Sequence, residues 1–120
     1  MYSFKELTIT KMRSGILAQL PLTGQWLEEL GFRVGEMVNV SWGDSCLTLT
    51  TNPTVKNHAC VLMVESKLTR KRPQTQLVLN GLLLKRYGFH IGDQVGLHLF
   101  PNKIQITKIN RFTTEQPTVS

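Results

Sequence analysis

Residues 19–50 read QLPLTGQWLEELGFRVGEMVNVSWGDSCLTLT, and residues 76–107 read QLVLNGLLLKRYGFHIGDQVGLHLFPNKIQIT. The second stretch repeats the first at a constant offset of 57 residues. The repeated positions are mostly glycines and core-type residues, which indicates a repeated backbone and packing scheme more than a repeated chemical site. Residues identical in both copies include, by their numbers in the first copy, Leu20, Leu22, Gly24, Leu27, Gly31, Phe32, Gly35 and Val38.

The chain length favours one shared core. A chain of 120 residues is an ordinary size for a single domain, whereas half of it, about 55 to 60 residues, is marginal as an independent core. We therefore predict one domain over residues 1–109, built from a first repeat at 1–51 and a second at 58–109. Residues 110–120 are expected to form a polar C-terminal tail.

The composition is that of a globular protein, with 41% hydrophobic and 18% charged residues. No window approaches the roughly 20 apolar residues of a membrane helix, and the first residues lack the apolar segment of a secretory signal. These features predict a cytoplasmic protein without a membrane partner. Cys46 and Cys60 do not recur at the repeat offset, so we expect neither a disulfide nor a metal site, and no cofactor is indicated.

The positive charge is unevenly distributed along the chain. Residues 1–57 hold five basic and five acidic side chains, whereas residues 58–120 hold nine basic and three acidic ones and so carry the whole net charge of +6. A one-sided basic surface attracts polyanions and speeds their encounter. The alternative is a basic soluble protein that has no such partner.

The first copy is predicted to contain four strands and one short helix. Residues 4–11 and 16–22 have strand patterns, with a turn at 12–15 between them. A helix is expected at 24–30, capped by Thr23 and ended by Gly31. Strands at 36–42 and 45–51 are expected to be joined by a tight turn at Gly43–Asp44.

The second copy is predicted to have the same elements. Its strands are expected at residues 60–65, 74–79, 94–99 and 103–109, with turns at 66–73 and at Pro101–Asn102. Asn80 replaces Thr23 as the helix cap, and Gly88 again ends the helix. Tyr87 is expected on the buried face of this helix, together with Leu83 and Leu84.

Two such copies in one chain predict a mostly β fold with short helices, in which each copy supplies strands to a common barrel or sandwich. The arrangement would have pseudo-twofold symmetry. The protein is then expected to be a monomer with an internal pseudo-dimer, or a homodimer.

Residues 21–50, with KELTITKM upstream, resemble the SymE family of bacterial type I toxin-antitoxin toxins. The family's run of glycine, tryptophan, leucine, two acidic residues, glycine and phenylalanine is met by Gly24, Trp26, Leu27, Glu28, Glu29, Gly31 and Phe32. The second copy resembles the family more weakly, because Leu83 stands where the tryptophan is expected. The resemblance implies the AbrB-like swapped-hairpin β-barrel and a toxin function, whereas members are expected to carry one unit per chain.

The resemblance also implies a nucleic-acid-binding face, because in AbrB-like folds the turn between the first two strands meets DNA. In this chain that turn contains Lys11 and Arg13 in the first copy and a denser basic cluster in the second. Contacts with six to eight phosphates would lower affinity about 10³-fold or more between 50 and 200 mM salt. The predicted nucleic-acid-binding residues are Lys11, Arg13, Lys67, Arg70, Lys71, Arg72, Lys85 and Arg86, with DNA preferred over RNA.

Other functions remain open. The basic turns are also explained as solvated hairpin tips that keep the protein soluble. Resemblance to RNA-cleaving toxins keeps an endoribonuclease as the runner-up, for which His90, Asp93, His98 and Arg86 supply the needed acid, base and cation types. No catalytic residue is predicted in the preferred interpretation, since no histidine recurs between the copies.

The exposed helix charge reverses between the copies, from Glu28 and Glu29 to Lys85 and Arg86. The acidic helix is the surface to test if the protein is instead an antitoxin or immunity partner, and drift at exposed positions explains the exchange equally well. Trp26 is predicted to pack in the core. Trp42, beside a turn, is interpreted as a strand-end cap or as a base-stacking aromatic.

Overall fold

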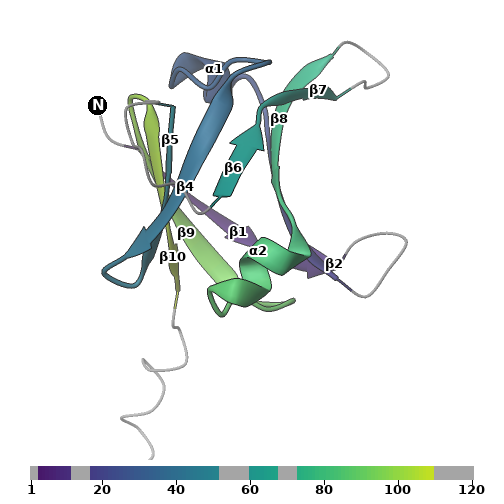
Figure 1. Ribbon diagram of the computed structural model, residues 1–120, viewed down its shortest axis with the longest axis vertical. Coiled ribbons are helices and arrows are strands. Elements are labelled where there is room, and N and C mark those ends of the chain that lie inside the picture. Colours follow the sequence, from purple (N-terminus) through teal and green to yellow (C-terminus); the bar gives the residue numbers. More distant parts are fainter. Residues whose placement is uncertain (1–2, 12–16, 52–59, 68–72, 110–120) are drawn as a thin grey trace, which may run out of the picture.

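The chain folds mainly into antiparallel strands in a computed structural model that describes residues 3–11, 17–51, 60–67 and 73–109 (Figure 1). The elements of the first copy are β1 (Ser3–Thr8), β2 (Thr10–Lys11), β3 (Ala18–Thr23), α1 (Trp26–Glu29), β4 (Met37–Gly43) and β5 (Cys46–Thr50). Those of the second are β6 (Cys60–Met63), β7 (Glu65–Lys67), β8 (Gln74–Leu79), α2 (Gly81–Arg86), β9 (Gln94–Phe100) and β10 (Lys103–Lys108). The predicted mostly β fold with short helices is confirmed.

The strands form two sheets that are shared between the copies. One sheet has the order β1-β9-β10-β5-β4-β6, and the other has the order β2-β3-β8-β7. The first strand of each copy is added to the other copy's part of the six-stranded sheet, since β1 pairs with β9 and β6 pairs with β4. Both orders read the same when the copies are exchanged, so the pairing has pseudo-twofold symmetry. No ladder joins the two sheets within the described ranges.

The chain crosses between the sheets at two equivalent points, Ile9 and Val64. The Ile9 amide donates to the Asp93 carbonyl at 2.9 Å, and the Val64 amide donates to the Glu36 carbonyl at 3.0 Å. Asp93 follows Glu36 by the repeat offset, but Val64 follows Ile9 by two residues fewer. Counted to equivalent positions of the repeat, the stretch from the crossing to the strand before the helix, which is β3 in the first copy and β8 in the second, is therefore two residues longer in the second copy, where it contains the denser basic cluster.

The core lies between the sheets and is lined by both copies. In the central pair of the smaller sheet, Leu20 pairs with Leu79 and Leu22 pairs with Leu77. All four side chains are almost completely buried, and burying each leucine contributes about 1.5–3 kcal/mol. Fully buried side chains from the other strands, the helices and the loop after α1 include Leu27, Phe32, Val38, Leu47, Leu49, Leu84, Val95, Leu97, Ile104 and Ile106.

The helices cover opposite ends of this core, α1 at the top and α2 at the bottom of Figure 1. The start of α2 agrees with the prediction, because the Asn80 side chain accepts a hydrogen bond from the Leu83 amide at 2.9 Å. The predicted cap of α1 is wrong. Thr23 ends β3, α1 begins only at Trp26, and no side-chain cap bond is made at Gln25.

The turns agree with the sequence in kind but differ in position at two places. The first is the turn predicted at 66–73, because β7 continues through Lys67. Gly31 and Gly88, at φ of 105° and 82°, end the two helices as predicted. The second is the turn between β4 and β5, which lies one residue later than predicted, because Asp44 and Ser45 both have positive φ, 54° and 59°. Two consecutive residues of this kind are typical of a type I′ hairpin turn. No helix of the described ranges is long and apolar enough to cross a membrane.

Candidate nucleic-acid interface

Three predicted basic residues gather around α2, at what we call the basic end of the molecule: Lys11, Lys85 and Arg86. Lys11 ends the edge strand β2 and pairs with Ala18 of β3. Ala18 and Lys85 line the same surface pocket of about 270 Å³, which places the last turn of α2 beside this strand pair. All three basic residues are exposed. Lys85 and Arg86 also lie at the helix C-terminus, where the helix dipole favours positive charge.

Within the described ranges, no neighbouring carboxylate neutralises these cations. Of the described residues, none forms an ion pair with Lys11, Lys85 or Arg86. Asp93 is the acidic side chain nearest in the sequence to α2, and it is held by Lys108 at 3.4 Å and lies 3.7 Å from His90. The charge of the basic end is therefore available to a ligand.

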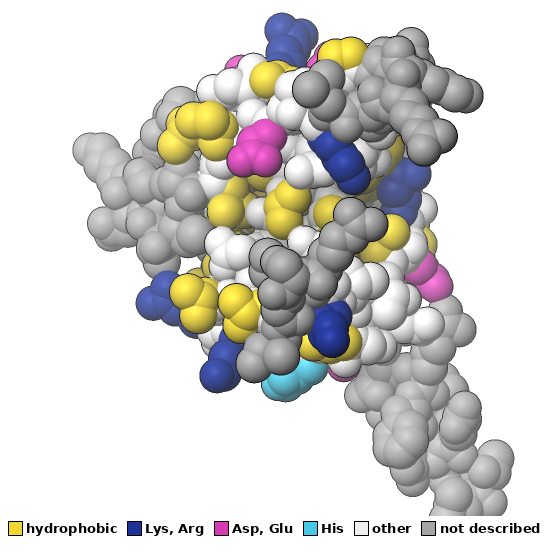
Figure 2. All heavy atoms as spheres, turned by 90° about the vertical axis from the view of Figure 1, so that its right-hand side faces the viewer, with side chains coloured by type: hydrophobic (Ala, Val, Ile, Leu, Met, Phe, Trp, Pro, Cys, Tyr) yellow, Lys and Arg dark blue, Asp and Glu magenta, His cyan; other side chains and the backbone are white. Residues whose placement is uncertain are grey.

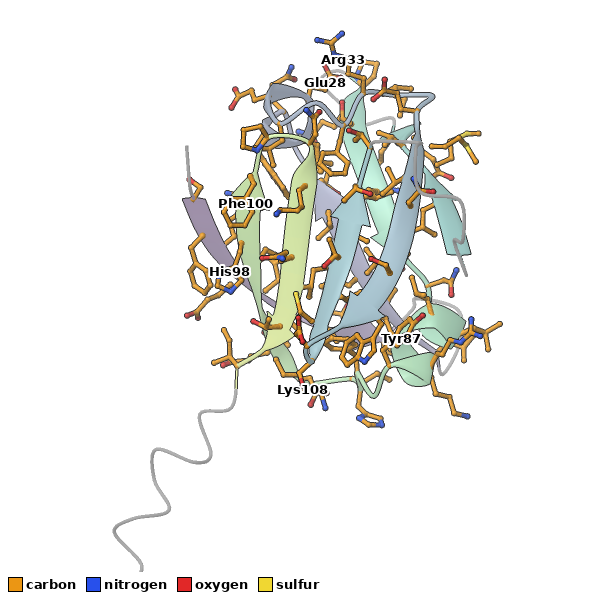
Figure 3. All side chains as sticks on the ribbon, turned by 60° about the vertical axis from the view of Figure 1, so that its left-hand side comes forward. Glu28, Arg33, Tyr87, His98, Phe100 and Lys108 are labelled. Carbon is orange, nitrogen blue, oxygen red and sulfur yellow. The ribbon has the colours of Figure 1, made fainter. Side chains whose placement is uncertain are left out.

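The opposite end, which we call the mixed end, combines basic and acidic side chains. Lys67 ends β7, is exposed, and pairs with Gln74 of β8. The neighbouring Thr75 hydroxyl donates a short hydrogen bond to the Glu28 carboxylate of α1. The acidic helix thus lies beside the strands that lead into the basic turn of the second copy. Glu28 and Arg33 mark this end of the molecule, and Tyr87 and Lys108 mark the other (Figure 3).

The two ends belong to one sheet. β2 and β7 are its two edge strands, and both lie on the right-hand side of the molecule in Figure 1, one low and one high. From the registers of the sheet, Lys11 and Lys67 are separated by three strand spacings and about seven residues along the strands, which corresponds to about 27 Å. Seen from that side, Lys and Arg side chains occupy several separate places among hydrophobic ones (Figure 2).

Half of the predicted site is outside the part of the chain that can be placed. Arg13, Arg70, Lys71 and Arg72 all lie outside the described residues. Their assignment to the interface remains a prediction from the sequence. The described part of the predicted site is Lys11, Lys67, Lys85 and Arg86.

The histidines do not converge on one site. The His90 amide donates to the Asp93 carboxylate at 2.8 Å, which fixes this pair at the start of β9. His98 lies further along β9, five residues after Asp93. An extended strand advances about 16 Å over five residues. The His98 ring instead lies edge-on to Phe4, with 5.1 Å between ring centroids. The set of His90, Asp93 and His98 considered for a ribonuclease is thus not assembled around one phosphate.

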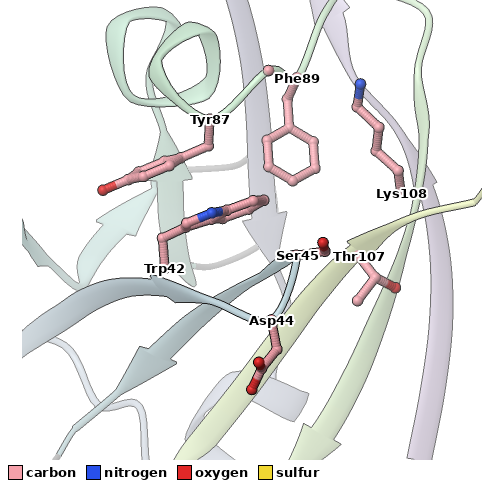
Figure 4. Close-up of a pocket in the computed structure, with 8 residues that line it drawn as sticks. Trp42, Asp44, Ser45, Tyr87, Phe89, Thr107 and Lys108 are labelled. Carbon is pink, nitrogen blue, oxygen red and sulfur yellow. The ribbon is translucent and has the colours of Figure 1, made fainter.

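An aromatic pocket near the basic end is the feature that the sequence analysis missed (Figure 4). It has a volume of about 510 Å³, and its lining residues come from the β4–β5 turn, the end of α2 and β10. Trp42 is stacked on Tyr87, with ring centroids 5.0 Å apart and 14° between the ring planes. Tyr87 had been expected to be only a core residue. The repeat contains one indication that Trp42 is not needed for packing, because the second copy has Leu99 at the equivalent position.

Metal-binding chemistry finds no support in the placed side chains. No group of three or more His, Cys, Asp or Glu residues that could hold a metal ion occurs within the described ranges. Cys46 is a free, half-buried thiol.

Comparison with known protein families identifies one match. Residues 13–51 match the family described as toxin SymE, type I toxin-antitoxin system. The match covers about a third of the chain and includes β3, α1, β4 and β5. It confirms the SymE resemblance for these residues and does not extend to the second copy. Neither the comparison with curated proteins nor that with solved structures gave a match.

Proposed function

We propose that this protein is a SymE-type toxin that acts by binding nucleic acid, preferably duplex DNA, without cleaving it. The observation that supports this proposal best is the basic end, where Lys11, Lys85 and Arg86 are exposed on neighbouring elements and unpaired with described carboxylates. Such a group raises the local concentration of a polyanion and speeds its association.

The spacing of the two ends is compatible with a duplex as the ligand. The distance of about 27 Å between Lys11 and Lys67 follows from strand geometry. It is less than one turn of B-DNA, which is about 34 Å long. The registers place Lys11 and Lys67 an odd number of residues apart, and therefore on opposite faces of the sheet, so a duplex that meets both has to cross the edge of the sheet.

The contacts expected at these ends are mainly to the DNA backbone. Lysine acts as a mobile point charge, whereas the planar fork of arginine holds a phosphate through two hydrogen bonds. Phosphate contacts orient a protein on DNA but do not read sequence directly. We therefore expect modest sequence preference, and at high occupancy the protein would cover or compact DNA. Because one chain supplies both copies, we propose that it binds as a monomer.

The runner-up is an endoribonuclease, to which the toxin family draws attention. It would have to use either the His90–Asp93 pair or His98 alone, because these groups are separated along β9. A third possibility is that the protein binds another protein, for which the acidic residues of α1 are the candidate surface.

One set of gel shifts distinguishes these functions. Duplex DNA, single-stranded RNA and heparin are titrated with the full chain at several salt concentrations, and the RNA is then checked for cleavage in the presence of a chelator. The proposal predicts duplex binding that weakens about 10³-fold between 50 and 200 mM salt, with intact strands, for six or more phosphate contacts. Binding that ignores salt contradicts the proposal. RNA cleavage that is lost on His90→Ala or His98→Ala establishes the ribonuclease, and absence of both activities favours the protein-binding role.

A further inference from the structure

The aromatic pocket is a preformed site at the edge of the basic end. Trp42 is held on one side by Tyr87 and at an edge by Phe89, whose ring centroid is 6.1 Å away at 85°. Phe89 also lines the pocket that contains Lys85, so the aromatic site and the basic end are adjacent. Its volume of about 510 Å³ lies within the range of small-ligand sites.

Trp42 combines a fixed ring with an accessible surface. The residue is 44% exposed although two aromatic rings contact it. A separation of 5.0 Å between the Trp42 and Tyr87 centroids leaves no room for a third ring between them. A planar ligand must therefore stack on the part of the indole that faces the pocket and not on Tyr87 (Figure 4).

The fold itself does not require this aromatic pair. At the equivalent positions of the pseudo-twofold, Leu99 replaces Trp42 and Leu30 replaces Tyr87, while Phe32 corresponds to Phe89. Leu99 is only 3% exposed. The equivalent pocket of the other copy is lined by Leu30 and Leu99 together with Trp26, so the packing scheme does not require a stacked aromatic pair at these two positions.

A cation lies at the rim of the same pocket. Lys108 is 47% exposed, and its Nζ lies 3.4 Å from the Asp93 carboxylate and 5.9 Å from the centre of the Phe89 ring. The equivalent residue in the first copy is Thr51. The counterpart pocket also has an aromatic ring and a cation, since Lys5 Nζ lies 5.2 Å from the centre of the Trp26 ring, so the two pockets differ in where the ring and the cation are placed.

We infer that this pocket binds one unpaired base of a single-stranded nucleic acid. The base stacks on Trp42, and Lys108 contacts a phosphate of the same strand, which combines the two elements of single-strand binding. A base inside a duplex is already stacked and paired, and so it cannot enter. This inference rests on the proposed function for its ligand class, and it adds a second mode that favours melted or single-stranded segments over the duplex.

The repeat itself provides the variants for a test. Trp42→Leu and Lys108→Thr introduce the residues that the other copy carries at these positions, so both changes suit the packing scheme. The probes are a short labelled single-stranded DNA of mixed sequence, a strand of equal length whose sugars lack bases, and the matching duplex. Circular dichroism and urea unfolding verify that each variant is folded.

We expect Trp42→Leu to weaken binding of the single strand about 5- to 150-fold, the range given by loss of one stacked base. Binding of the abasic strand and of the duplex should change less than about 2-fold. Lys108→Thr should weaken binding of both single strands, because it removes a phosphate contact. In the unmodified protein, the single strand should quench tryptophan fluorescence, and that quenching should be lost in Trp42→Leu, which retains Trp26.

The outcomes separate this inference from the proposed function. Unchanged single-strand affinity in Trp42→Leu overturns the inference, even if duplex binding is strong. An equal loss for the normal and the abasic strand also overturns it, because the indole would then not be contacting a base. A selective loss together with no duplex binding by the unmodified protein supports the pocket and contradicts the duplex proposal. Should the unmodified protein bind neither strand nor duplex, both are wrong.

Discussion

Neutralising the basic face of α2 should reduce DNA affinity in a salt-dependent way. The change is Lys85→Gln with Arg86→Gln, which lowers the net charge from +6 by two. Both residues are exposed and lack ion pairs with described carboxylates. The fold should be retained, since loss of the interaction with the helix dipole costs only about 0.3–1 kcal/mol per charge.

The size of the effect follows from counterion release. Each phosphate contact contributes about −0.9 to the slope of log K against log salt, so eight contacts give about −7.2 and six give about −5.4. If the affinity extrapolated to 1 M salt is unchanged, loss of two contacts weakens binding about 60-fold at 100 mM and about 3-fold at 500 mM salt. The effect should therefore largely vanish at high salt.

The assay is fluorescence anisotropy of a labelled duplex at several salt concentrations, with urea unfolding of each variant as a stability check. A matched control is Glu29→Arg, which places a cation at the position equivalent to Arg86 in the first copy. It is expected to strengthen binding and to steepen the slope by up to about 0.9. A double variant whose slope equals that of the unmodified protein refutes the assignment of α2 to the interface. So does a loss that is the same at every salt concentration.

Three further predictions concern the framework of the site, and urea unfolding measures each. Asn80→Ala should lower the free energy of unfolding by about 1 kcal/mol, because it removes the cap of α2. Gln25→Ala should change it by less than about 0.5 kcal/mol, because α1 has no cap bond at Gln25. Equal losses in the two variants would contradict this difference between the helices. Leu49→Ala, at the buried centre of the six-stranded sheet, should cost about 2–5 kcal/mol, and a loss under 1 kcal/mol would place this residue outside the core. Gly81→Ala would put a Cβ 2.8 Å from the Leu17 Cβ, so it should destabilise by about 1–3 kcal/mol despite better helix propensity. A stabilised variant would show that α2 does not pack this closely on the chain before β3.

Much of the fold follows from local patterns in the sequence. The alternation of apolar residues in the strands and the glycines that end the helices are dictated by neighbouring residues, and they were predicted at nearly the observed positions. The start of α1 was missed because it depends on a distant partner. The Gly24 amide donates to the Thr75 carbonyl at 3.0 Å, so sheet pairing continues to this residue and delays the helix.

The candidate site was predictable only in its charges. Basic residues are recognisable from composition, and the repeat showed that Lys85 and Arg86 replace acidic residues. The aromatic pocket was not predicted, because its residues come from three segments that are distant in sequence. The difference between Trp42 in one copy and Leu99 in the other was a sign of the pocket in the sequence. That difference alone does not show that Tyr87 stacks on the Trp42 ring.

The location of the DNA contacts is tested most directly by NMR. The chain, of 13.6 kDa, is small enough for amide spectra to be recorded on a labelled sample while a short duplex is added. We predict that the shifted amides concentrate in β2, β7 and α2, including Lys11, Lys67, Lys85 and Arg86, and that the shifts reverse when salt is added. Shifts confined to the central strands of the six-stranded sheet, β5 and β10, or no shifts at all at low salt, would contradict the account.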